Sequence, residues 1–253
     1  MKPRTFLLGF GFAACAGLQA QTLPPPVSVL LPSYEKAARN YALLKKEAGD
    51  AEASTLPQVE ELRALKAQAP GWFRDWSLRR KLSQTQERLD DLSRQRAELE
   101  SARQDLFLQL SALEEELRSS LEKELSSQRR DPAAVEKIRG WLEYKRRWDR
   151  ELEDLGSSEA RPFDLVEVPK QAPTRQIMAD QKKALEARGI QLEAWADMLA
   201  SDLRLWKRLG AGNFVPQKNA TARIAELEGL SRHVAALIRK NEAQRLANGA
   251  QKK

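Results

Sequence analysis

The chain has 253 residues, of which 31% are charged and 6% are aromatic. Lysine and arginine number 43 against 36 acidic residues, so the formal net charge is +7. One cysteine and one histidine exclude, within a single chain, a structural zinc site of four cysteines or of two cysteines and two histidines, and they exclude an intramolecular disulfide. No catalytic, cofactor-binding or metal-binding residue is predicted, and the protein is expected not to be an enzyme.

The N-terminal residues 1–20 have the layout of a secretory signal peptide. Lys2 and Arg4 precede an uncharged, mostly apolar run, and Ala20 suits the last position before cleavage. The run has about 14 residues, fewer than the roughly 20 that span a bilayer. We therefore expect export to the periplasm or secretion, with no transmembrane segment in the mature chain. As an alternative, residues 12–15 resemble a bacterial lipobox, in which lipidated Cys15 would anchor the protein.

The next part of the chain is expected to contain little regular structure before its first helices. Residues 21–32 include three consecutive prolines, which favour an extended leader. Short helices are expected over 33–70. Ser33 is a candidate N-cap of the first helix, and Thr55 with Gln58 has capping-box spacing at the start of a second.

The strongest pattern is a heptad repeat that follows Trp76. Leucines and a few polar residues recur at alternating spacings of three and four, and neither proline nor glycine interrupts residues 76–130. The pattern predicts one helix of about 50 residues, about 75 Å long. The expected seam residues of this helix are Leu78, Leu82, Leu89, Leu92, Leu99, Leu106, Leu110, Leu113 and Leu117.

A second heptad stripe begins after Asp131-Pro132, a typical N-cap and first helical residue, and it ends near Gly156. The short turn between the two stripes favours an antiparallel coiled-coil hairpin over 76–155. The second arm is shorter, so the base of the long helix needs cover from flanking helices or from another chain, and a homo-oligomer stays open. The seam residues of this second arm are Ile138, Trp141, Trp148 and Leu152.

The remaining chain predicts a Pro-containing linker over 156–174, a C-terminal helical pair over 175–247 and a disordered tail over 248–253. The stripe of the first helix in this pair includes the charged residues Arg188 and Asp202. The whole pattern predicts an all-α fold: an elongated antiparallel coiled-coil hairpin with additional packed helices and no sheet.

Basic residues interleave with aromatic ones around residues 72–81 and 144–150, and two arginines interrupt the leucine stripe. Such positions are candidate contacts for an acidic protein or an anionic envelope surface, while nucleic acid is unexpected for an exported protein. The alternative is a solvated basic face, with the stripe arginines paired to Glu98 or Glu100. Glu114, Glu115 and Glu116 are expected to be solvated. The candidate contacts are Arg79, Arg80, Lys81, Arg96, Arg103, Lys145, Arg146, Arg147 and Arg150.

Four tryptophans follow helical spacing: Trp141 with Trp148, and Trp195 with Trp206. Because both pairs lie on the apolar stripe of their own helix, core packing is expected, with an aromatic binding surface as the alternative.

Two functions fit these features. The first is a cell-envelope scaffold or adaptor that acts through protein–protein binding. The second is a periplasmic holdase chaperone. The basic charge, the export signal and the helical arms over 76–155 resemble in general character the Skp family, whose helical tentacles enclose unfolded outer-membrane proteins. The resemblance implies a binding role for unfolded exported proteins.

Overall fold

The part of the chain that the structure describes forms five helices and contains no strand. The computed structural model describes residues 23–68, 72–127, 132–157 and 175–250. The helices of these ranges, with no strand among them, confirm the predicted all-α class. No helix in these four ranges is long and apolar enough to cross a membrane. The helices are α1 (Pro25–Gln68), α2 (Trp72–Ser126), α3 (Pro132–Ser157), α4 (Arg175–Ala211) and α5 (Gln217–Ala250).

Some of the predictions fall outside the described residues. They include the signal peptide over 1–20, the alternative lipidation site Cys15, and linker residues 158–174. Four predicted site residues also have side chains outside the described part, namely Leu78, Arg79, Arg80 and Leu82.

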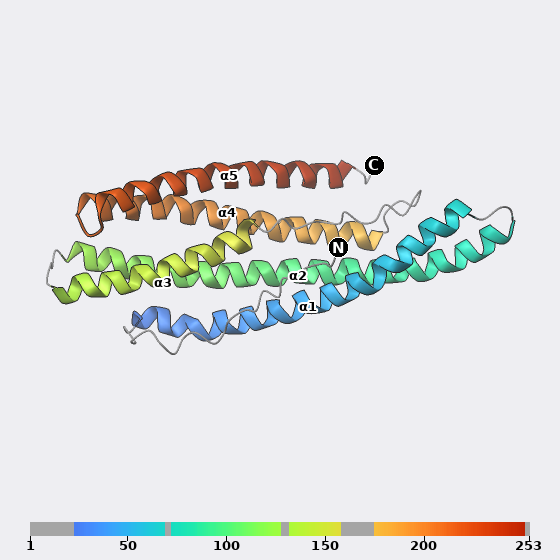
Figure 1. Ribbon diagram of the computed structural model, residues 1–253, viewed down its shortest axis with the longest axis horizontal. Coiled ribbons are helices and arrows are strands. Elements are labelled where there is room, and N and C mark those ends of the chain that lie inside the picture. Colours follow the sequence, from blue (N-terminus) through green and yellow to red (C-terminus); the bar gives the residue numbers. More distant parts are fainter. Residues whose placement is uncertain (1–22, 69–71, 128–131, 158–174, 251–253) are drawn as a thin grey trace, which may run out of the picture.

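The long helix α2 organises the bundle (Figure 1). At 1.5 Å per residue its length is about 82 Å. Helices α1 and α4 lie along opposite sides of α2, α3 packs on α2 and α4, and α5 packs on α4. The end of the α1–α2 hairpin, where Gln68 leads towards Trp72, projects beyond the other helices (Figure 1). We call this end the arm.

The N-terminal region differs from the prediction. The sequence predicts an extended leader over 21–32 and short helices over 33–70, whereas α1 is one continuous helix that begins at Pro25. The expectation is wrong because prolines cost little in a first helical turn, where the N–H groups have no helical partner. Thr55 is not a cap but lies inside α1, where its Oγ1 donates to the Ala51 carbonyl oxygen at 2.8 Å.

A narrow stripe of small and apolar side chains holds α1 against α2. Small residues allow two helices to approach closely, although each buries little apolar area. Two internal prolines, Pro32 and Pro57, remove helical hydrogen bonds, so tertiary packing rather than local propensity selects this helix. The buried residues of the stripe are Val27, Ala37, Ala48, Thr55 and Val59.

The core lies where the leucine stripe of α2 meets α3 and α4. Of the predicted seam on α2, Leu99 is only half-buried. Trp195 and Trp206 of α4 are also buried, as are both predicted tryptophans of α3, so these four side chains belong to the core. The buried seam residues are Leu89, Leu92, Leu106, Leu110, Leu113, Leu117, Ile138, Trp141, Trp148 and Leu152.

Two side chains of α4 cap the C-terminal end of α3 by donating hydrogen bonds to its carbonyl oxygens. Gln191 Nε2 donates to the Leu155 carbonyl oxygen at 3.1 Å, and Arg188 Nη2 donates to the Gly156 carbonyl oxygen. These donors satisfy carbonyls that a helix end leaves without a partner. A Cβ built on Gly156 would lie 2.5 Å from the indole ring of Trp195, so glycine permits the close contact of α3 with α4.

The last helix covers α4 through a stripe with a seven-residue repeat. Near the turn the two helices approach closely, since a Cβ on Gly210 would lie 2.9 Å from the Ala220 Cβ. Farther along, Asn241 Nδ2 donates to the Leu185 carbonyl oxygen at 3.2 Å. The α5 helix continues to Ala250, so the predicted disordered tail is wrong over 248–250. The buried residues of the stripe are Ala220, Leu227, Val234 and Asn241.

Candidate functional site

Four charged side chains meet in the core around the ammonium group of Lys145. Lys145 Nζ donates to Glu114 Oε1 at 2.5 Å, to Asp202 Oδ2 at 2.7 Å and to Asp149 Oδ1 at 2.9 Å. The side chains of Lys145 and Glu114 have no exposed surface, and that of Asp202 is 1% exposed. We call Glu114, Lys145, Asp149 and Asp202 the buried ion cluster.

The buried ion cluster joins four helices. Glu114 lies on α2, Lys145 and Asp149 lie one turn apart on α3, and Asp202 lies on α4. From α5, Arg223 Nη2 donates to Asp149 Oδ2 at 2.9 Å. The cluster forms only when all of these helices pack together, so it reports on the complete fold.

The carboxylates keep Lys145 charged. Burial in the core disfavours the ammonium form, but the negative charges of Glu114, Asp149 and Asp202 outweigh that penalty and raise the pKa of Lys145 above its usual value. The lysine therefore remains protonated at neutral pH and acts as a fixed positive charge rather than as a base.

Asp202 has the opposite tendency. The pKa of Asp202 is raised to about 8. Burial is the largest cause, the negative charges of Glu114 and Asp149 add to the shift, and the positive charge of Lys145 opposes it. Its second oxygen, Oδ1, has no hydrogen-bond partner among the described residues, so a proton there displaces no hydrogen bond. Asp202 therefore binds a proton more readily than an ordinary aspartate does.

Two predictions are corrected by this cluster. Glu114 was expected to be solvated and Lys145 to contact a partner, but both are buried. Lys145 occupies a stripe position of α3 that faces α2 and α4, so no partner reaches it. Oxygen atoms of Glu114, Asp149 and Asp202 lie within 4.8 Å of one another, a spacing that could suit a cation, but the Lys145 ammonium already bonds all three.

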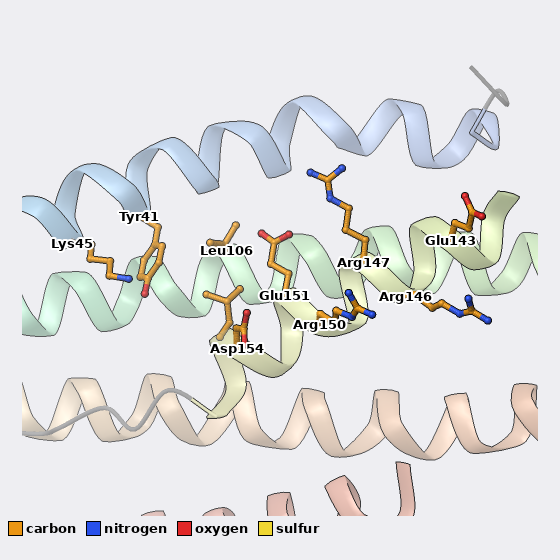
Figure 2. A pocket seen from close by; sticks show the side chains of 10 residues that line it. Tyr41, Lys45, Leu106, Glu143, Arg146, Arg147, Arg150, Glu151 and Asp154 are labelled. Atoms are coloured by element: carbon orange, nitrogen blue, oxygen red, sulfur yellow. The ribbon is translucent and has the colours of Figure 1, made fainter. Parts of the chain in front are cut away.

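A groove with a cavity volume of about 550 Å³ lies on the surface between α1 and α3 (Figure 2). Helix α1 contributes Tyr41 and Lys45 to its lining, and α2 contributes Leu106. Helix α3 supplies the other lining residues. They are Glu143, Arg146, Arg147, Arg150, Glu151, Asp154 and Leu155.

A hydrogen bond links the two helices that border the groove. The Tyr34 hydroxyl of α1 donates to Glu151 Oε1 of α3 at 2.6 Å. Burial, followed by the hydrogen bond to this carboxylate, raises the pKa of Tyr34 above its usual value. The tyrosine therefore stays neutral and remains a donor, and this bond fixes the spacing of α1 and α3.

Three other predicted contact residues, Arg96, Arg103 and Lys81, form ion pairs within the chain. Arg103 Nη2 lies 2.5 Å from Glu100 Oε2, a pairing that the sequence suggested. Arg96 instead pairs with Glu52 of α1 at 3.0 Å. The sequence does not show that this part of α1 lies beside Arg96. Lys81 pairs with Glu61.

Sequence reasoning missed the acidic members of the buried ion cluster. In the groove it missed Tyr41, Lys45, Glu143, Glu151 and Asp154. One signal was available for the cluster. Lys145 interrupts the apolar stripe of α3, and Asp202 interrupts that of α4, so two opposite charges occupy positions that face a core. For Glu114 no comparable signal exists, since it begins a run of three glutamates that ends at Glu116.

A comparison with protein-family models found no match, and comparisons with curated proteins and with solved structures likewise found none. The interpretation of the groove and of the buried ion cluster therefore rests on their own geometry.

Proposed function

We propose that this protein is exported and acts, without catalysing a reaction, as a scaffold or adaptor of the cell envelope through protein–protein binding. The observation that carries the proposal is the shape of the bundle, in which one long helix joins a packed body to a projecting arm (Figure 1). Such a shape separates two surfaces by a fixed distance. The groove between α1 and α3 provides a hollow on the side of the body.

The arrangement of the charged groups also supports a binding role. The buried ion cluster is enclosed by helices and holds α2, α3, α4 and α5 together, so its role is structural. The arginines of α3 that border the groove, in contrast, are exposed to a partner. Rigid presentation of exposed charge favours specific recognition because it lowers the ordering cost of binding.

The chaperone alternative receives less support. A holdase needs apolar surface for unfolded chains, whereas the stripe from Leu106 to Leu117 is buried within the bundle. Large exposed apolar side chains among the described residues are spread over several helices and include Val29, Leu108, Ile190 and Leu246.

Site-specific photo-crosslinking in the native cell envelope tests the proposal. A crosslinking amino acid replaces exposed Gln84 of α2 in one strain and Asp154 of the groove in another. A scaffold is expected to give one discrete product at a defined ratio from at least one position. A ladder of many products, together with suppressed aggregation of several unrelated unfolded proteins, would instead favour the holdase.

A further inference from the structure

The groove between α1 and α3 carries an inference that rests on the proposed scaffold function and names the chemistry of the partner. We infer that this groove binds a polypeptide segment of the partner protein in which acidic side chains alternate with apolar ones. Three features of the groove favour such a segment: the positive charges at its rim, its apolar floor and the mixed sign of the charges in its lining.

The rim of the groove offers two arginines to an acidic partner. Arg146 and Arg150 lie four residues apart, so their side chains share one face of α3, and both are exposed. Neither forms an ion pair with a residue in the described ranges. Each guanidinium can bind a carboxylate through two parallel hydrogen bonds. Lys45 adds a third positive charge from α1 (Figure 2).

The floor of the groove is apolar. Leu106 of α2 and Leu155 of α3 line the groove, and the ring of Tyr41 borders it on α1. These side chains can contact a leucine or a similar side chain of the partner. A ligand with carboxylates alone would leave this surface uncovered, so alternating acidic and apolar residues match the lining better.

The acidic residues of the lining favour a polypeptide over other anionic partners. Glu143, Glu151 and Asp154 lie among the cations, and they repel nucleic acids, polyanionic glycans and anionic membranes. A polypeptide can place carboxylates beside the arginines and neutral or basic groups beside these acids. The recessed shape also disfavours a membrane, which protruding apolar side chains bind.

Fluorescence anisotropy with the full chain tests the inference. The probe is a short fluorescein-labelled peptide that alternates glutamate and leucine. It is expected to bind the protein, and the R146E/R150E double substitution should weaken binding by about tenfold or more. A peptide that alternates lysine and leucine should show the reverse preference and bind the substituted protein more tightly. Circular dichroism checks that each variant remains helical, and R146Q/R150Q offers a milder change.

The matched control is R232E/R239E, which makes the same change of charge at exposed arginines of α5. This control should bind the glutamate peptide like the unsubstituted protein. Equal loss in the control, no binding of the peptide, or competition by heparin or phosphatidylglycerol vesicles with the same dependence on Arg146 and Arg150 would overturn the inference. A crosslink from Gln84 but none from Asp154 would also overturn it, while the scaffold proposal would stand.

Discussion

Lys145 Nζ lies 2.7 Å from Asp202 Oδ2, although 57 residues separate the two in the chain. The bond crosses from α3 to α4 inside the core and brings together the two charges that interrupt the apolar stripes of those helices. A buried charge pair seldom adds much stability over a well-packed apolar pair, but loss of one partner leaves the other without compensation. The first two predictions follow from this relationship.

Substitution of Lys145 by methionine is expected to destabilise the protein by about 3–5 kcal/mol, because it leaves buried carboxylates without their cation. The measurement is the free energy of unfolding from urea denaturation followed by circular dichroism. Lys137→Met is the control, since Lys137 pairs with Glu124 at the surface and its side chain is 47% exposed; it should cost at most about 1 kcal/mol. Equal costs for the two variants would contradict the structural role of the cluster.

The stability of the protein should depend on the ionisation of Asp202. Its pKa is about 8 in the folded state, compared with 3.8 for an ordinary aspartate. Between these values the folded protein holds one proton that the unfolded chain has released, so stability falls as pH rises, by about 1.4 kcal/mol per pH unit from this group alone. The stability that this proton contributes is fully present below pH about 4 and is lost once pH passes about 8.

The Asp202→Asn variant isolates this contribution. An asparagine resembles the protonated carboxyl but does not titrate. The free energy of unfolding of the variant, relative to that of the unsubstituted protein, should therefore increase as pH rises between about 4 and 8. Urea denaturation at several pH values measures the difference. The groups near Asp202 are retained in the variant; they are Glu114, Arg118, Lys145, Asp149 and Arg223. A constant difference across this pH range would show that Asp202 is ionised in the folded protein.

Gly156→Ala should destabilise the contact between α3 and α4. The added Cβ would lie 2.5 Å from the Trp195 ring, and such overpacking costs about 1–3 kcal/mol. Gly229→Ala provides the control, because a Cβ there meets no atom within 4 Å and alanine favours the helix by about 0.5–1 kcal/mol. Thermal denaturation measures both. A gain in stability for Gly156→Ala would contradict the close packing at Trp195.

Amide hydrogen exchange should distinguish the arm from the body. Of the described helices only α1 and α2 reach into the arm (Figure 1), whereas α4 packs against α2, α3 and α5. Fewer buried contacts lower the free energy of local opening, so amides near residues 55–65 should exchange sooner than those near residues 195–209. Mass spectrometry after a time course of exchange measures this. Equal protection in both regions would contradict the view of the arm as a two-helix extension.

The sequence predicted the helices whose stripes contain large apolar residues. Leu106 and Leu117 on α2, and Ile138 and Leu152 on α3, recur at a spacing that only a helix brings onto one face. The α1 helix was harder to predict because its stripe uses Ala37, Ala48 and Thr55, and because its prolines resemble breaks. Its helical state depends on α2, a partner that local sequence does not reveal.

The candidate site was predictable only in part. Arg146 and Arg150 were recognised because consecutive basic residues mark a charged surface. Lys145 belongs to the same run of basic residues, but the rotation of α3 about its axis places the Lys145 side chain in the core. The groove itself could not be predicted, since it exists only because α1 and α3 both pack on α2 while leaving space between them.

The end of α3 has a consequence for the order in which the chain folds during synthesis. Its last carbonyls, at Leu155 and Gly156, accept hydrogen bonds from Gln191 and Arg188, which the ribosome adds only after more than thirty further residues, 32 in the case of Arg188. Until then the final turn of α3 lacks these two donors, and α4, which supplies part of the core, is absent. The core therefore closes late.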